Sequence, residues 1–179
     1  MDIMLISAPT DEDWIAVKED ALVTSGKKVV NPPDSKWKHD MLRARHSPIR
    51  DLNYRFLLKD VPSWITVHLS RHVHAQPFIE SQRNDRQSNY DRRKAPQDSP
   101  IDMIWSIHAE ELMTVANKRL CQKASQETRE VVRAICDIAE EHTPEFRGLL
   151  VPMCERLHGH CEEIHPCGRF SNTDYVDEV

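Results

Sequence analysis

The chain has 179 residues, 39% of them hydrophobic, which suffices for one folded domain with a core but not for two comfortable ones. Its 24 basic and 29 acidic residues give a net charge of -5 and a pI near 6.0, which argues against a general nucleic-acid binder because phosphate contacts require a basic surface. No window approaches the roughly 18 apolar residues that cross a bilayer, and acidic residues stand where a signal peptide has basic ones, so a cytoplasmic protein without membrane partners is expected.

The amino-terminal segment predicts a strand followed by a helix. Residues 2–7 form a short apolar run, and Thr10 is a candidate cap for a helix that stops at Gly26. The polar segment 27–48 carries two adjacent prolines and a short helical pattern around Met41. We expect this segment to connect elements rather than to form core.

A half-buried strand is predicted over residues 52–59 from a period-2 alternation of apolar side chains. Its inward-facing residues are Leu52, Tyr54, Phe56 and Leu58. Pro62 is expected in the first turn of a helix. The stretch 69–83 at the end of that helix, LSRHVHAQPFIESQR, has neither a helical nor a strand period. The polar residues 84–100 predict an exposed loop that separates two halves of the chain.

Two helices are predicted after this loop. Helical spacing is kept by Ile101, Ile104, Trp105, His108, Leu112 and Val115, and again by Thr128, Val131, Val132, Ile135, Ile138 and Ala139. Thr143 is expected to cap a short third helix. We therefore expect a single domain over residues 1–170, with a Cys/His-rich end at 152–168 and a frayed tail at 171–179.

The stretch 69–83 concentrates groups that suit an anion. Arg71, His72, Ser81 and Arg83 could form a pocket for it, because guanidinium groups and hydroxyls match phosphate oxygens in geometry and charge. The alternative is a solvated loop whose charges are accidental, since charged residues are mostly exposed.

The same stretch resembles the signature of the flavin-dependent thymidylate synthases, which is Arg-His-Arg, seven residues, Ser, any residue and Arg. Here the signature reads Arg71, His72 and Val73, then seven residues, then Ser81, Gln82 and Arg83. All of its fixed positions match except the third, where valine replaces arginine.

Other segments extend the resemblance along the chain. LISAPTDEDW is similar to the family's opening strand and turn, HSPIRD to its His-x-x-Pro-x-Glu-His segment, and DRRKAP to its Ala-Arg-x-x-Leu-Pro turn. ANKRLCQKASQETREVVRAI is similar to the helix pair with Leu-Arg-Leu-Cys-x-x-Ala-Gln-Trp-Glu-Ile-Arg. The tail VPMCERLHGHCEEIHPCG resembles the Pro-x-Cys, Gly-x-Cys and Cys-Gly endings of many members.

The resemblance implies an α+β fold in which a small antiparallel sheet packs with long helices, assembled as a homotetramer with its sites between subunits. The implied contacts to the flavin FAD are His46, Arg71, His72 and His108. The implied contacts to the substrate dUMP are His68, Ser81, Gln82, Arg83, Arg92 and Arg119, of which Ser81, Arg83 and Arg92 hold the phosphate.

Arg119 is the catalytic residue that the resemblance implies. Hydride addition at C6 of the pyrimidine leaves negative charge on the ring carbonyl and C5, where a guanidinium group stabilises it. Reduced FAD supplies the hydride, with NADPH as co-substrate, and methylenetetrahydrofolate supplies the one-carbon unit. The alternative is a structural Arg119 that pairs with Glu127 or Glu130 across the helix pair.

The sequence departs from the family around the ring and the flavin. Besides Val73, Ile79 stands at a usual glutamate, and Glu110 and Thr114 stand where the family has Arg and Asn or His. The departures imply a divergent, phage-type enzyme acting in a bacterial host, or a changed reaction. The candidate functions are thymidylate synthesis, hydroxymethylation of dUMP or a related pyrimidine nucleotide, and non-catalytic binding of a nucleotide or of a protein.

The cysteines raise the question of a metal. Five cysteines, an odd count, favour reduced thiols over a disulfide framework. Cys154, Cys161 and Cys167 with one tail histidine would suit tetrahedral zinc, although their spacing is not that of a zinc knuckle or finger. The alternative is three reduced cysteines beside surface histidines. Cys121 and Cys136 are expected to be packing residues.

Overall fold

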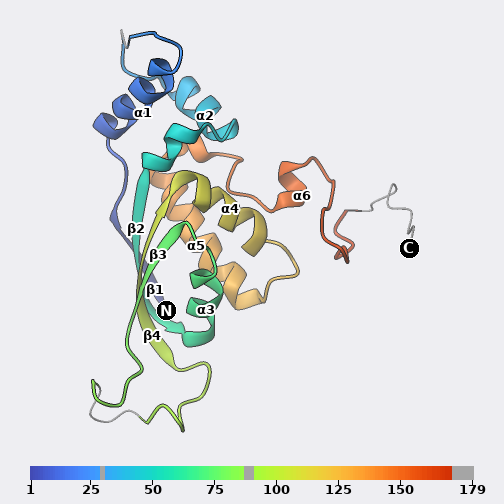
Figure 1. Ribbon diagram of the computed structural model, residues 1–179. Coiled ribbons are helices and arrows are strands. Elements are labelled where there is room, and N and C mark those ends of the chain that lie inside the picture. The colour runs from blue at the N-terminus through green and yellow to red at the C-terminus, as the bar shows by residue number, and fades with distance from the viewer. Residues whose placement is uncertain (29–30, 87–90, 171–179) are drawn as a thin grey trace.

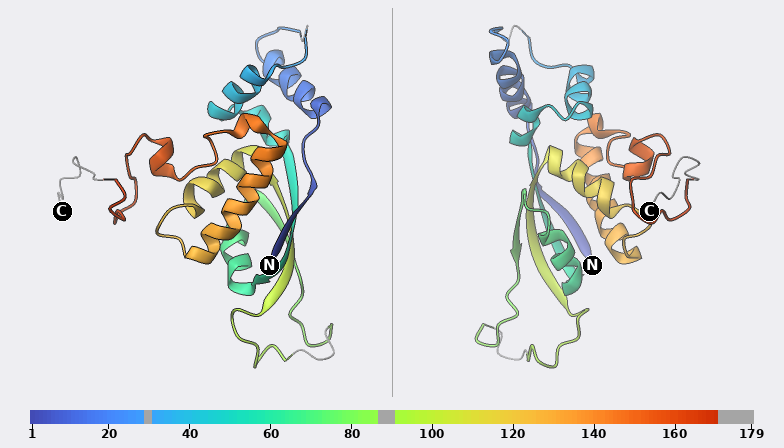
Figure 2. Two further views of the ribbon diagram at one scale, coloured as in Figure 1. Left: turned by 180° about the vertical axis from the view of Figure 1, so that it is seen from behind. Right: turned by 45° about the vertical axis from the view of Figure 1, so that its right-hand side comes forward.

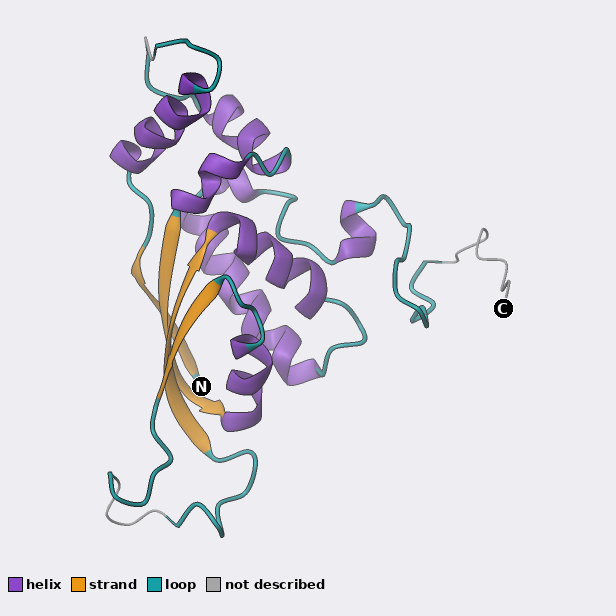
Figure 3. Ribbon diagram, viewed as in Figure 1, coloured by secondary structure: helices purple, strands orange, loops and turns teal. Residues whose placement is uncertain are grey.

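The computed structural model describes residues 1–28, 31–86 and 91–170, and the tail expected to fray lies outside them. Figure 1 shows helices against one face of a small sheet, and Figure 3 separates the two layers by colour. The sheet is antiparallel with four strands in the order β1-β2-β4-β3. These features confirm the α+β class and the small antiparallel sheet.

The described residues contain four strands, six α-helices and two short 3₁₀ helices. The strands are β1 (Asp2–Ser7), β2 (Asn53–Pro62), β3 (Ala75–Ile79) and β4 (Pro100–His108). The α-helices are α1 (Asp11–Val23), α2 (Ser35–Arg43), α3 (Ser63–Ser70), α4 (Ala109–Arg119), α5 (Gln126–His142) and α6 (Met153–Arg156). The 3₁₀ helices are η1 (Ser47–Asp51) and η2 (Pro144–Phe146). None of the helices in these ranges combines the length and the apolar character that crossing a membrane requires.

Local sequence signals explain the first elements. Thr10 caps α1 as predicted: its Oγ1 accepts a hydrogen bond from the Asp13 N–H, and the Asp13 carboxylate accepts one from the Thr10 N–H. The alternation predicted for β2 is confirmed, because all four inward-facing residues of that pattern are fully buried. Strand β2 pairs with both β1 and β4, so this buried row lies in the centre of the sheet.

Residues 100–108 form strand β4, so the prediction that a helix begins at Ile101 is wrong. Burial alternates along this segment, with Met103, Trp105 and Ile107 almost fully buried between more exposed neighbours. Apolar residues lie on both faces of this strand, and some of them fall at the three- and four-residue intervals that are typical of a helix. The helix begins at Ala109 instead. The side chain of His108 caps it by accepting a hydrogen bond from the Glu111 N–H.

The stretch 69–83 also contains a strand that its pattern concealed. Residues 75–79 form β3 and pair with β4 at the edge of the sheet. Pro77 interrupts the pattern, and an edge strand tolerates proline because half of its N–H groups need no partner in the sheet. Since β3 and β4 are neighbours in one sheet, the loop between them does not separate two halves of the fold.

Two further expectations are corrected. Helix α2 forms within the segment expected only to connect elements, but its Met41 and Leu42 are buried in the core. The side chain of Thr143 makes no capping hydrogen bond to η2. Its hydroxyl instead lies 2.8 Å from the hydroxyl of Tyr54, which lets both polar groups be buried.

Helices α3, α4 and α5 cover one face of the sheet, and the views in Figures 1 and 2 leave the other face open. An apolar row crosses all four strands on this open face. The register places Met4 opposite Leu57, Leu57 opposite Ile104, and Ile104 opposite Phe78. Phe78 is 59% exposed and Met4 38% exposed. The row is thus exposed at its two ends and half-buried between them, which makes it a candidate interaction surface.

Candidate functional site

Two motifs that lie far apart in the sequence meet at the end of α4. Arg119 lies in the last turn of α4, and His72 lies in the turn between α3 and β3. Nε of Arg119 donates a hydrogen bond to Nε2 of His72 at 3.1 Å, and its Nη2 donates one to the carbonyl oxygen of His68 at 3.0 Å. The structure therefore brings together three of the predicted site residues.

The alternative role for Arg119, pairing with Glu127 or Glu130 across the helix pair, is not seen among the described residues. Glu130 accepts a hydrogen bond from Gln126 on its own helix, and no ion pair joins Arg119 to Glu127 or Glu130 among these residues. Arg119 is instead half-buried and directed at the signature turn.

A buried carboxylate completes this cluster. Glu111 is 6% exposed, and its Oε1 lies 3.2 Å from Nδ1 of His72. Glu111, Val115 and Arg119 follow each other at intervals of four residues, so α4 presents them on one face. The imidazole of His72 consequently lies between a carboxylate and a guanidinium group. We call Glu111, His72 and Arg119 the α4 cluster.

Burial sets the protonation of the cluster. It lowers the pKa of His72 to about 4, and the positive charge of Arg119 acts in the same direction. The pKa of Glu111 is raised, mainly by burial. The pKa of His68 is lowered, first by burial and then by Arg119 and Arg71. His72 is therefore neutral near pH 7, which leaves one ring nitrogen free to accept a hydrogen bond.

A second group of candidates lines a groove of about 390 Å³ that also includes Glu111. The lining residues are Arg50, His74, His108, Glu110, Glu111 and Thr114. Nδ1 of His108 accepts the hydrogen bond that caps α4, which places its ring proton on Nε2. Arg50 is hydrogen-bonded to Glu110 and lowers the pKa of that carboxyl group. The acid at position 110 is thus compensated by a cation from η1.

The size and charge of this groove decide whether it could hold FAD, and we call it the flavin groove because it contains the implied flavin contact His108. Its volume lies in the range of about 300–1,000 Å³ that is usual for small-molecule sites. Arg71 and His46 are exposed, at the end of α3 and at the start of η1, and both can donate hydrogen bonds. Arg50 is the only arginine or lysine that lines the groove, and it is already paired. The diphosphate of FAD would therefore need cations from outside this groove.

The phosphate candidates lie elsewhere, in the loop that joins β3 to β4 (Figure 1). Arg83 forms a two-pronged ion pair with Asp85, at 2.9 Å and 2.6 Å. The backbone N–H of Arg92 donates to the side chain of Asn84. Ser81 is half-buried and Arg92 is exposed. No contact among the described residues joins these candidates to the α4 cluster.

One groove brings together a residue that binds Arg119 and a residue that lies between two of the phosphate candidates. His68 of α3 and Gln82 after β3 both line a groove of about 490 Å³, together with the apolar side chains of Trp64, Val67 and Ile79. The ring of His68 packs edge-on against Trp64, with its centroid 5.3 Å away. The structure thus brings two predicted nucleotide contacts to the same wall.

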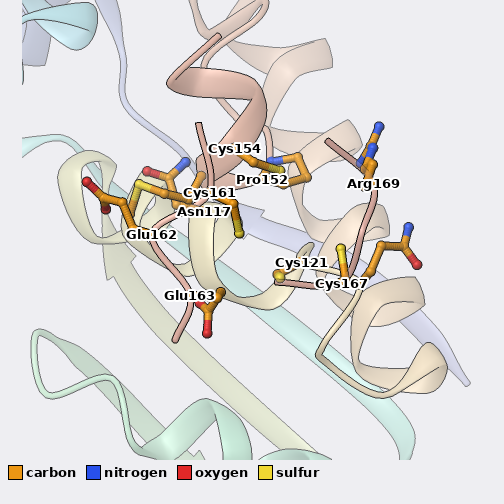
Figure 4. Close-up of a pocket in the computed structure, with 11 residues that line it drawn as sticks. Asn117, Cys121, Pro152, Cys154, Cys161, Glu162, Glu163, Cys167 and Arg169 are labelled. Atoms are coloured by element: carbon orange, nitrogen blue, oxygen red, sulfur yellow. The ribbon is translucent and has the colours of Figure 1, made fainter. Parts of the chain in front are cut away.

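Four cysteines line a small cavity between the end of α4, α6 and the segment 161–169, which Figure 4 shows. They are Cys121, Cys154, Cys161 and Cys167. In the ranges that the structure describes, no group of three or more His, Cys, Asp or Glu side chains is placed to hold a metal ion. The structure therefore gives the zinc hypothesis no support. Cys136 is buried as expected, whereas Cys121 lines this cavity rather than packing in the core.

Sequence reasoning missed Glu111 and Arg50. For Glu111 a signal was present, because it lies eight residues before Arg119 and so on the same helix face. For Arg50 no local signal exists, because its partner Glu110 is 60 residues away in the sequence.

Comparisons with known proteins agree with the resemblance. The family model described as thymidylate synthase complementing protein matches residues 90–145. No curated protein sequence matches the chain.

Two solved structures share the fold. One is thymidylate synthase X (ThyX) from Helicobacter pylori with FAD and dUMP, with a TM-score of 0.67 and 16% identity over 84% of this chain and 99% of that one. The other, flavin-dependent thymidylate synthase ThyX from the same organism complexed with FAD and dUMP, has a TM-score of 0.64 and 20% identity over 82% of this chain and 98% of that one. The family match and the shared fold confirm the resemblance to the flavin-dependent thymidylate synthases.

Proposed function

We propose that the chain is a flavin-dependent thymidylate synthase that binds FAD and dUMP and transfers a one-carbon unit from methylenetetrahydrofolate to C5 of dUMP. The observation that carries the proposal is the 3.1 Å hydrogen bond between Arg119 and His72. These residues belong to the two motifs on which the resemblance depends most, and the fold joins them across 47 positions of the sequence.

Arg119 is the proposed catalytic residue. His72 and the carbonyl oxygen of His68 hold two of its nitrogens, so the guanidinium group has a fixed direction. A fixed cation stabilises charge that develops on the pyrimidine ring without having to reorganise during the reaction. When bound, reduced FAD supplies the hydride for this reaction, with NADPH as the proposed reductant. His46, Arg71, His72 and His108 are the proposed flavin contacts.

The proposed phosphate site comprises Ser81, Arg83 and Arg92. In dUMP-bound protein, Arg83 exchanges Asp85 for the phosphate, which carries more charge and accepts hydrogen bonds from the same planar fork. Gln82 and His68 face the nucleotide from their shared groove.

A complete site requires more than one copy of the chain. No hydrogen bond or ion pair joins the phosphate candidates to the α4 cluster among the described residues of one chain. In addition, the open sheet face carries an apolar row that a second copy would cover. Both observations support a homotetramer in which the loop of one subunit meets the α4 cluster of another.

Hydroxymethylation of dUMP is the second candidate function. It uses the same carbon donor without the final reduction, so it tolerates a weaker flavin site. The Arg50–Glu110 pair favours it, because this pair occupies the one arginine of the flavin groove.

The proposed binding functions are tested together by adding FAD and dUMP to the purified protein. Bound flavin gives an absorption band at about 450 nm, and calorimetry should show dUMP binding that Arg83→Ala weakens by about 1.5–3 kcal/mol, the scale of a hydrogen bond to a charged group. Arg86→Ala, in the same loop, is the matched control. A protein that retains no flavin, or an Arg83→Ala variant with wild-type affinity for dUMP, would contradict the proposal.

A further inference from the structure

Glu111 is the one charged residue among the buried residues of the described ranges, and burying a carboxylate is costly unless it is hydrogen-bonded. Its side-chain partner is His72, whose side chain is 10% exposed. The packing of α4 does not itself require an acid at this position, because its neighbours Leu112 and Val115 are buried and apolar. The position therefore calls for an explanation through His72.

The direction of the hydrogen bonds fixes the tautomer of His72. Nε of an arginine can only donate, so Nε2 of His72 must be the acceptor in their 3.1 Å contact. The ring proton is consequently on Nδ1, which faces Oε1 of Glu111 at 3.2 Å. The carboxylate accepts this proton's hydrogen bond and so favours the tautomer that Arg119 needs.

The charges around the cluster support this arrangement. Arg71 acts electrostatically on Arg119. His74 and Arg45 act to lower the pKa of Glu111, and Glu110 acts to raise it. Because burial and Arg119 both disfavour a second proton on His72, the imidazole stays neutral between the Glu111 carboxylate and the Arg119 guanidinium group.

We propose that Glu111 is a positioning residue, which directs Arg119 at the substrate by holding His72 in the Nδ1-protonated form. Without Glu111, the ring is free to carry its proton on Nε2. The Nε2–H of His72 and the Nε–H of Arg119 then face each other. The guanidinium group must turn away from His72, and a displacement of about 1 Å from the productive position can cost on the order of 10²-fold in rate. The catalytic consequence rests on the proposed function, whereas the tautomer does not.

The test compares Glu111→Leu with Glu111→Gln. Both side chains have a volume similar to that of glutamate, but only glutamine keeps an oxygen that accepts the Nδ1–H bond. Glu130→Leu is the matched control, because Glu130 is exposed on α5 and contacts no member of the α4 cluster.

Nitrogen NMR of ¹⁵N-labelled histidine and arginine gives a readout that needs no turnover, with His72→Gln to assign the signals. In the wild-type protein we expect a protonated Nδ1 and an unprotonated Nε2 on His72, and an Arg119 Nε–H that exchanges slowly with water. Glu111→Leu should give mixed tautomers and fast exchange, whereas Glu111→Gln and Glu130→Leu should resemble the wild type. A wild-type His72 protonated on Nε2 would overturn the proposal even if Glu111→Leu did not fold.

Steady-state kinetics supply the second readout. We expect Glu111→Leu to lower kcat by about 10²-fold with a smaller change in KM, and Glu111→Gln to recover most of the loss. Equal kcat per folded molecule in Glu111→Leu and wild type would refute the positioning role. If the wild type forms no product from dUMP, the proposed function fails, and the NMR signals of His72 and Arg119 alone decide whether Glu111 orders the cluster.

Discussion

At the scale of single residues, the account depends on Arg119 acting on charge that exists only during the reaction. Interactions of that kind raise kcat rather than ground-state affinity. Arg119→Ala should therefore fold, retain its flavin and bind dUMP within about tenfold of normal, while turnover falls by about 10²- to 10³-fold. Turnover and melting temperature should be measured on one preparation. Lost stability with unchanged turnover per folded molecule would show that Arg119 is only structural.

The pKa of His72 leads to a prediction about stability and pH. Its pKa is about 4 in the folded protein and 6.5 when unperturbed, so the unfolded chain binds a proton first as the pH falls. The neutral, hydrogen-bonded His72 thus contributes stability that is complete above pH 6.5 and is lost as the pH falls to about 4. The shift corresponds to about 3 kcal/mol at most.

Urea unfolding between these pH values measures this contribution. The difference in unfolding free energy between wild type and His72→Gln should shrink as the pH falls, because glutamine does not titrate. The opposing effect of Glu111, whose raised pKa favours proton uptake by the folded state, is present in both proteins. Parallel curves for the two proteins would contradict a buried, neutral His72.

The residues of the site were predictable to different degrees. Arg119, His72 and His68 were each named as site residues from local motifs, and they lie together in the fold. The partner of each residue was not predictable: Glu111 contacts His72 and Arg50 contacts Glu110 only through tertiary folding. The pairing of Asp85 with Arg83, two residues apart, was not predicted either.

At the scale of elements, the type of an element was predicted correctly where strong periodicity left one clear apolar face. It was predicted wrongly where both faces carried apolar residues. Strand β2 and helix α5 alternate cleanly between buried and exposed residues, and both were predicted. Strand β4 carries apolar residues on both faces, since Ile104 belongs to the open-face row and Met103 to the core. Strand β3 was concealed by its proline. Both failures concern the paired strands β3 and β4, at one side of the sheet.

The strand assignment of β4 makes opposite predictions for adjacent residues. Met103 is 1% exposed, so Met103→Ala should cost about 2–5 kcal/mol of unfolding free energy, as removal of a buried side chain does. Ile104 points to the open face, and in the isolated subunit Ile104→Ala should cost far less. A helix would bury Ile104 and expose Met103. Urea denaturation of both variants at a concentration that keeps subunits apart distinguishes the two, and the reverse ranking would contradict the strand.

At the scale of the whole molecule, the account requires that subunits share a site. Arg83→Ala and Arg119→Ala should each be nearly inactive, but their co-expression should restore activity. If Arg83 and Arg119 of one site come from different chains, random mixing leaves each of the two residues intact with a probability of about one half. Both are then intact in about a quarter of the sites, so about a quarter of the wild-type turnover should return. Turnover of the co-purified mixture measures this directly. A mixture as inactive as its components would place the whole site within one chain.

Assembly is also where the sequence alone is weakest. The apolar row on the open face appears only once β1, β2, β4 and β3 lie side by side, because each strand contributes a single residue to it. No segment of the sequence contains that surface. The distance between the α4 cluster and the loop with the phosphate candidates is also invisible in the sequence. It depends on β3, which runs away from the turn that contains His72 (Figure 1).

The most direct test of the central claim is mass analysis of the nucleotide after incubation of the protein with dUMP, FAD, NADPH and methylenetetrahydrofolate. We expect a methyl group to replace the hydrogen at C5, and we expect Arg119→Ala to abolish this product while Arg86→Ala does not. A hydroxymethyl group at C5 would instead establish the second candidate reaction. Unchanged dUMP, from protein shown by calorimetry to bind it, would contradict the claim that this chain is a one-carbon transferase.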